Sequence, residues 1–237
     1  MNAEQIQEAF EKVRSEIREA EKTSGRPAGS VQLCAVSKFH PAQDVLAALW
    51  AGQHLFGENR VQEAYAKFNE VRAAGNECTL HMIGALQLNK VKKAVEVAQC
   101  IQSVDREEVL AEIEKYASKI DKTMQVYFEL HTGEDSKSGY ADKETLLASV
   151  QHCADGMYPH IIPAGLMTMA PFTDDEKAIR SSFSTLRELR ESLNKAFPSL
   201  PITELSMGMS GDFKIAIEEG STMVRVGTAL FGPRQAQ

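Results

Sequence analysis

The chain has 237 residues, of which 43% are hydrophobic and 25% carry a charge. This composition is that of an ordinary globular protein and excludes the disordered, collagen-like and coiled-coil classes. The net charge of −7 argues against broad electrostatic capture of nucleic acid or of an anionic membrane, and no run reaches the roughly 18 apolar residues that span a bilayer.

The N-terminal segment predicts an amphipathic helix over about residues 3–22. Ile6, Phe10, Val13 and Ile17 recur at spacings of three and four among charged residues, which places them on one helix face. The acidic composition of this segment is unlike a secretory or transit signal. The four cysteines form no CxxC pair, so we expect them to stay reduced in a cytoplasmic protein.

From residue 31 onward, eight short apolar runs alternate with helical segments. Nearly continuous apolar runs are typical of parallel strands that are covered on both faces. Eight such repeats in roughly 200–250 residues favour a (β/α)8 TIM barrel, an α/β fold, over an open sheet. We therefore expect a single domain over 1–237. The predicted strands are 31–37, 54–58, 79–85, 100–105, 124–130, 161–168, 202–208 and 222–228, and the predicted helices between them are 41–52, 59–75, 86–98, 106–120, 142–154, 174–197 and 211–220.

Lys38 follows the first predicted strand directly. In such barrels the working residues stand where strands end and loops begin. Burial in an apolar barrel mouth favours the neutral form of a lysine amine, and a neutral amine attacks an aldehyde to form a Schiff base. Lys38 is therefore a candidate carbonyl-binding residue, and a solvated lysine leaving a strand is the alternative interpretation.

The turns after the last two strands suit an anion. The segment SMGMSGD (206–212) opens a predicted helix with Ser210 as its expected N-cap, and backbone N–H groups at such a turn bind anions. Gly227 and Thr228 follow the eighth strand, where the backbone can approach an anion closely. Phosphate sites of these barrels often lie in these two loops, although each glycine also suits an ordinary turn. The candidate lysine and the two turns together indicate a ligand that has both an aldehyde and a phosphate group, and pyridoxal phosphate is such a ligand.

Arg225 adds a mechanistic detail to this site. Strand alternation puts Arg225 on the same side as Gly227, so its guanidinium would face the ring beside the phosphate turn. Arginine only donates hydrogen bonds, so a pyridine nitrogen facing it stays unprotonated and the ring is a poor electron sink. Many pyridoxal-phosphate enzymes use an aspartate there instead. An outward-facing surface arginine is the alternative.

Two further features carry less weight. The polar loop 132–142 suits a lid with Lys137 reaching inward, although a plain solvated loop is the simpler interpretation. The six histidines show no grouping with cysteine at metal-ligand spacing, so no metal site is predicted.

Seven motifs resemble those of a known family. Together they resemble the pyridoxal phosphate homeostasis proteins, which are single-domain barrels similar to the N-terminal barrel domain of alanine racemase. The resemblance implies a bound pyridoxal 5'-phosphate and no securely assigned turnover. In order between about residues 31 and 234, the motifs are AVSKFHP, FGENRVQE, HMIGALQLNKVKK, EDSKSG, GLMTMAP, LSMGMSGDFKIAI and GSTMVRVGTALFG.

The resemblance also implies roles for single residues. Lys38 would hold the cofactor as an internal aldimine, and Arg225 would face the pyridine nitrogen. Gly227 and Thr228 would bind the phosphate through backbone N–H and hydroxyl groups, together with Ser210.

Asn59 and Ser206 would, by the same resemblance, line the pocket near the ring. We therefore expect a monomeric carrier of pyridoxal phosphate that helps regulate its supply, with recipient apo-enzymes as partners and no catalytic residue. Nine residues follow Thr228, too few for the second domain from which alanine racemase takes one acid/base group. The alternatives are a weak amino-acid racemase completed by an oligomer partner, a Schiff-base aldolase acting on a sugar phosphate, and a regulatory module that binds a partner protein.

Overall fold

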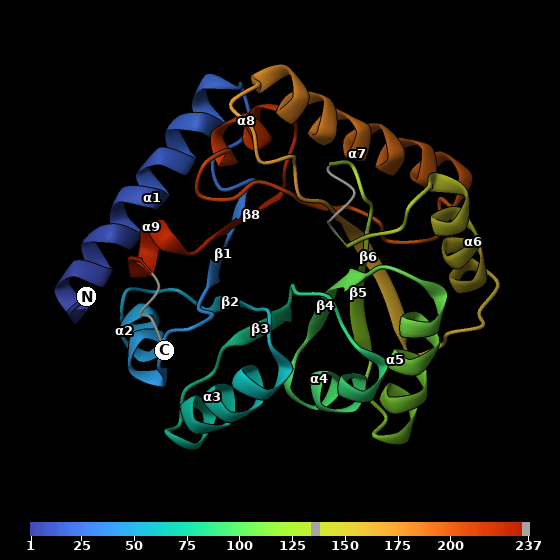
Figure 1. Ribbon diagram of the computed structural model, residues 1–237, viewed down its shortest axis with the longest axis horizontal. Helices are drawn as coiled ribbons and strands as arrows, with labels where there is room; N and C mark the ends of the chain where they lie inside the picture. Colours follow the sequence, from blue (N-terminus) through green and yellow to red (C-terminus); the bar gives the residue numbers. More distant parts are fainter. Residues whose placement is uncertain (134–137, 234–237) are drawn as a thin grey trace.

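The structure, a computed structural model, describes residues 1–133 and 138–233. Within these residues eight strands form a closed barrel, in which each strand pairs in parallel with the next and the last pairs with the first (Figure 1). The predicted (β/α)8 barrel is therefore confirmed. The strands are β1 (Gln32–Val36), β2 (Leu55–Glu58), β3 (Thr79–Met82), β4 (Cys100–Val104), β5 (Met124–Glu129), β6 (Ile161–Met167), β7 (Glu204–Ser206) and β8 (Met223–Val226).

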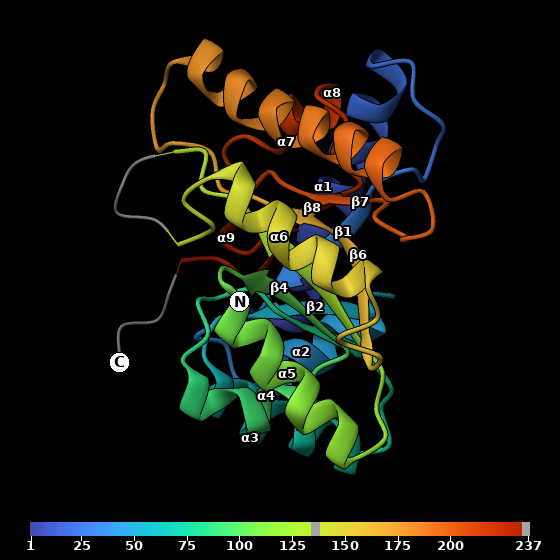
Figure 2. The same ribbon diagram turned by 90° about the vertical axis from the view of Figure 1, so that its right-hand side faces the viewer.

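The helices surround the barrel on its outside (Figure 1). Figure 2 shows α5, α6 and α7 side by side on one flank. Within the described residues, no helix combines the length and the apolar character that crossing a membrane requires. The helices are α1 (Ala3–Thr23), α2 (Ala42–Trp50), α3 (Val61–Ala73), α4 (Val91–Val97), α5 (Glu107–Lys119), α6 (Lys143–Ala154), α7 (Glu176–Ala196), α8 (Phe213–Glu218) and α9 (Thr228–Phe231), with a 3-10 turn, η1 (Leu88–Lys90), before α4.

The N-terminal helix α1 packs against α2, α8 and α9, on the flank where β8 meets β1 (Figure 1). A capping box fixes its first turn, because the side chains of Asn2 and Gln5 each accept the backbone N–H of the other. Its predicted apolar face is buried, and Phe10 packs edge-on against Phe231 at a centroid distance of 5.7 Å. Burial of each such side chain contributes roughly 1.5–3 kcal/mol. The predicted N-terminal helix is confirmed.

The barrel interior is a packed core. Sulfur-containing and aromatic side chains from β1, β4, β5, β6 and β8 fill part of it. Three buried polar side chains share this interior and bond to one another. Ser206 donates to Oε1 of Gln102 over 2.6 Å, and Nε2 of Gln102 lies 2.7 Å from Nδ1 of His81.

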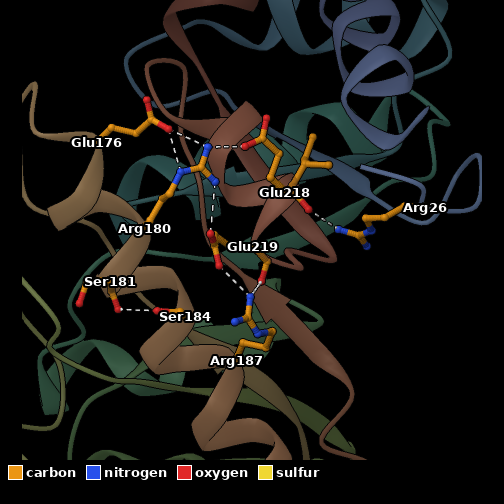
Figure 3. Close-up of polar contacts among 9 residues, drawn as sticks. Arg26, Glu176, Arg180, Ser181, Ser184, Arg187, Glu218 and Glu219 are labelled. Carbon is orange, nitrogen blue, oxygen red and sulfur yellow. Dashed lines mark hydrogen bonds and ion pairs between the residues drawn. The ribbon is translucent and has the colours of Figure 1, made fainter. Parts of the chain in front are cut away.

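A network of ion pairs ties α8 to α7 (Figure 3). Arg180 contacts Glu218 and Glu219, and Arg187 donates to the carboxylate of Glu219 over 2.7 Å and to its carbonyl over 2.8 Å. Arg26 donates to the last turn of α8 from the segment before β1. Single exposed pairs contribute little, but a shared network holds one geometry. It fixes α8, and with it the loop that leads from β7 into α8.

Candidate cofactor site

A cavity of about 400 Å³ opens where the barrel strands end. We call it the cofactor cavity. Its walls come from the ends of β1, β2, β3, β6, β7 and β8 and the segments that follow them, so residues far apart in the sequence meet there. Six of the seven predicted site residues line it, namely Lys38, Asn59, Ser210, Arg225, Gly227 and Thr228.

Lys38 stands two residues beyond the end of β1 and is half-buried. Beside it, Gly227 brings the turn after β8 close to β1, since a Cβ added there would lie 3.1 Å from the carbonyl oxygen of Val36 and 3.3 Å from its Cβ. Glycine suits this position, because an added Cβ would be tighter than ordinary van der Waals contact. The predicted proximity of a lysine and a glycine turn is therefore present.

Arg225 lies in β8 with only 4% of its surface exposed, and its side chain reaches the cofactor cavity. Its NH1 donates to the carbonyl and hydroxyl of Ser206 over 2.7 and 2.8 Å, and its NH2 donates to the carbonyl of Thr168 over 2.8 Å. A guanidinium has five N–H donors, and the described residues supply acceptors for three of them, which leaves two for a ligand. Burial lowers the pKa of Arg225, but arginine stays protonated in proteins.

Ser206, contrary to expectation, is not among the residues that line the cofactor cavity. Ser206 is the last residue of β7 and is fully buried. Its hydroxyl accepts from Arg225 and donates to Gln102, so both functions of the hydroxyl are used inside the barrel. Ser206 therefore orients the Arg225 side chain from inside the barrel.

The wall expected to bind phosphate comes from the loop before α8 and the start of α9. The backbone N–H groups of Ser210, Gly211 and Thr228 have no acceptor within 1–133 and 138–233. Backbone N–H groups that face a cavity bind anions. The prediction that Ser210 caps α8 is wrong, because the N-cap is Asp212, whose carboxylate folds back to accept from the N–H of Met209 over 2.5 Å.

Asn59 lines the cavity and has a buried amide oxygen. Its Oδ1 is buried and has no hydrogen-bond partner in the described part of the chain. Its backbone is held by Gly84, where a Cβ would lie 2.6 Å from the carbonyl oxygen of Asn59. A buried polar atom without a partner costs free energy, so this position is a strained feature of the cavity wall.

The sequence reasoning missed a buried acid near this mouth. Glu129 ends β5 with 1% of its surface exposed. Burial raises its pKa to about 7, while a hydrogen bond from Ser138 and the charge of Arg225 act in the opposite direction. The signal was present, because Glu129 is the one charged residue in the apolar run MQVYFEL.

The rim of the cavity was also missed. Met169, Phe172 and Met209 line it, and Phe172 is 94% exposed. These residues lie in loops, which carry no periodic signal. Lys137, the other lysine considered for this mouth, lies outside the described residues.

The fold and the site define a barrel of the alanine racemase type. The sequence profile of the family described as "Alanine racemase, N-terminal domain" matches residues 10–235. An alanine racemase of Clostridium difficile 630 has a TM-score of 0.71 at 16% identity, covering 94% of this chain and 55% of its own. That likeness concerns the fold alone.

Two other relatives match at higher identity and over nearly their whole length. The pyridoxal phosphate homeostasis protein of Pasteurella multocida is 36% identical over 232 residues, or 97% of each chain. The structure of PipY of Synechococcus elongatus, solved with PLP bound, has a TM-score of 0.84 at 36% identity and covers 96% of this chain and 100% of its own. The chain therefore belongs to the family of pyridoxal phosphate homeostasis proteins, as its motifs predicted.

Proposed function

We propose that this protein binds pyridoxal 5'-phosphate in the cofactor cavity and holds it as a Schiff base on Lys38. One observation carries the proposal: one cavity is lined by a lysine, an arginine and backbone N–H groups that have no acceptor among the described residues. These groups match the aldehyde, the pyridine nitrogen and the phosphate of that cofactor. PipY was solved with PLP bound and is 36% identical to this chain, which supports the assignment.

Lys38 supplies the amine for the covalent step. A C=N bond forms between its Nζ and the aldehyde carbon, and the aldehyde oxygen leaves as water with the two amine protons. The reaction needs the neutral amine. Hydrolysis reverses the step, so the cofactor can be released intact.

Arg225 favours holding over turnover. A guanidinium donates to the pyridine nitrogen and cannot take up a proton. The nitrogen therefore stays unprotonated, and the ring withdraws electrons weakly from a bound amino acid. The groups that bind the cofactor thus do little to activate it.

A protein that binds pyridoxal phosphate reversibly and does not use it for catalysis acts as a buffer of the cofactor. We propose that the protein keeps pyridoxal phosphate bound in the cytoplasm, out of reach of stray amines, and releases it to apo-enzymes. The name of the Pasteurella multocida relative, a pyridoxal phosphate homeostasis protein, supports this role.

The absorption spectrum of the purified protein tests the covalent bond. We expect an imine band that borohydride removes, with the reduced adduct mapped to Lys38 by mass spectrometry. Lys38→Ala should abolish the band while far-UV circular dichroism shows a retained fold. A reducible band that survives in Lys38→Ala would move the linkage to another lysine, such as Lys137.

Proton exchange tests whether the protein only holds its cofactor. Alanine and other amino acids are incubated with the loaded protein in deuterated water, and exchange at the α-carbon is followed by NMR. No exchange above that of free cofactor is expected. Exchange that Lys38→Ala abolishes would establish a racemase-like activity instead.

A further inference from the structure

The backbone next to Lys38 is held in an unusual conformation. Phe39 has a φ of 67°, in the left-handed region that aromatic residues rarely adopt. The guanidinium of Arg60 lies over the Phe39 ring at 4.8 Å from its centroid. A residue persists in such a conformation only where its surroundings hold it.

Two side chains of α3 bind the backbone on either side of Lys38. Nζ of Lys67 donates to the carbonyl of Ser37 over 2.7 Å, and Oε1 of Glu63 accepts the N–H of Phe39 over 2.6 Å. Lys67 and Glu63 are one helical turn apart and bond to each other over 2.9 Å. The chain of contacts therefore closes around Lys38, and we call it the Lys38 bracket.

The Lys38 bracket is anchored by a buried ion pair. Nζ of Lys67 also lies 2.8 Å from Oε1 of Glu58, and the side chains are 6% and 0% exposed. The hydroxyl of Ser37 donates to the same oxygen over 2.7 Å. Burial raises the pKa of Glu58, and the charge of Lys67 opposes that shift. A buried ion pair often adds no more to the free energy of unfolding than well-packed apolar residues would. Its hydrogen bonds, however, hold the paired side chains in one geometry.

We propose that Lys67 and Glu63 are positioning residues for Lys38. They hold the two peptide units on either side of it, so the direction of its Cα–Cβ bond is fixed and its amine is delivered into the cofactor cavity. This inference rests on the proposed function, since it assumes that Lys38 forms the Schiff base. If the bracket served folding only, removing it would lower stability without changing the chemistry of Lys38.

Lys67→Met tests the proposal, because methionine fills the same space without the three hydrogen bonds. Lys122→Met is the matched control: Lys122 is half-buried and donates to two carbonyls, of Val95 and Ala98, over 2.6 Å each, ahead of β5 at the other end of the barrel. Pyridoxal phosphate is titrated into each variant stripped of cofactor, and the pKa of the imine is read from its absorbance. Lys67→Met should bind about tenfold more weakly, the factor that 1.4 kcal/mol represents, with a shifted imine pKa. Lys122→Met should match the parent in both.

Glu63 provides a second test that does not disturb the buried pair with Glu58. Glu63→Gln keeps an acceptor for the Phe39 N–H, whereas Glu63→Ala removes it. We expect Glu63→Gln to keep most of the affinity for pyridoxal phosphate and the imine pKa of the parent. Glu63→Ala should bind more weakly and show a shifted imine pKa. This pair decides the matter even if Lys67→Met fails to fold.

The outcomes separate the two proposals. A parent protein without a borohydride-reducible imine on Lys38 would overturn the proposed function and the bracket together. A parent with that imine, and Lys67→Met and Glu63→Ala variants with unchanged affinity and imine pKa, would overturn the bracket alone.

Discussion

Arg225 and Ser206 are joined twice, because one nitrogen of the guanidinium donates to both the carbonyl and the hydroxyl of Ser206, over 2.7 and 2.8 Å. The contacts continue through the barrel from Ser206 to Gln102 and from Gln102 to His81. Burial lowers the pKa of His81 to about 4, so its ring is neutral and Nδ1 accepts from the Gln102 amide. The orientation of Arg225 at the cavity therefore depends on the centre of the barrel.

Ser206→Ala should weaken both stability and cofactor binding. It removes one acceptor from Arg225 and leaves Oε1 of Gln102 without its donor, which costs about 1–3 kcal/mol in a buried site. Urea unfolding and titration with pyridoxal phosphate measure the two effects. Ser184→Ala is the control, since the half-buried Ser184 donates to the carbonyl of Ser181 in its own helix (Figure 3) and to no other acceptor among the described residues. Equal affinity of Ser206→Ala and the parent would show that Ser206 does not orient Arg225.

Arg225→Gln should reduce affinity for pyridoxal phosphate while the imine with Lys38 still forms. Glutamine keeps a donor but loses the charge and the fork that reaches Ser206 and Thr168. We expect roughly tenfold weaker binding, as for the loss of one charge-assisted hydrogen bond. Arg72→Gln, which changes an arginine bonded to the Val97 carbonyl between α3 and α4, should bind as the parent does. An unchanged affinity in Arg225→Gln would show that Arg225 does not contact the cofactor.

The barrel and most of the site were predictable because they depend on local pattern. Apolar runs mark the strands, and the rule that function lies at strand ends brought Lys38, Arg225 and Gly227 together. Ser206 also stands at a strand end, but its hydroxyl is bonded inside the barrel to Gln102 and Arg225, which the strand pattern does not predict. Its partner Gln102 lies 104 residues away in the chain, and no local pattern encodes that contact.

One part of the Lys38 bracket, the buried position of Lys67, is visible in the helical periodicity of the sequence. Lys67 falls on the face of α3 that is otherwise buried through Ala64, Phe68 and Val71. A charged residue on an apolar helix face requires a partner, because burial of an isolated charge is costly. The sequence therefore indicates a buried ion pair, but not that Glu58 and Glu63 both supply it.

Gly227→Ala should disturb the phosphate wall. The added Cβ would lie 3.1 Å from the Val36 carbonyl oxygen, so the turn after β8 must move away from β1, at a cost of about 1–3 kcal/mol. Gly211→Ala, in the loop before α8, has nothing within 4 Å of its added Cβ and should leave the unfolding free energy unchanged. If inorganic phosphate protects the parent from heat and both variants equally, the turn at Gly227 does not contact the phosphate.

Glu129 makes stability depend on pH near neutrality. Burial raises its pKa from 4.5 to about 7 in the folded protein, so between these values the folded state binds the proton more tightly than the unfolded state. Stability from this group is fully present below pH 4.5 and is lost as the pH rises through 7, by about 3 kcal/mol at most. Asp105 adds to the shift and Arg225 opposes it.

Glu129→Gln tests this dependence, because glutamine resembles the protonated acid and does not titrate. Relative to the parent, we expect Glu129→Gln to gain stability between pH 5 and pH 8, measured by urea unfolding at both values. Glu112→Gln, which removes a half-buried carboxylate bonded to Lys115, should show no such change with pH. The assignment to Glu129 is wrong if the difference between Glu129→Gln and the parent is the same at pH 5 and pH 8, since the titrating group would then lie elsewhere.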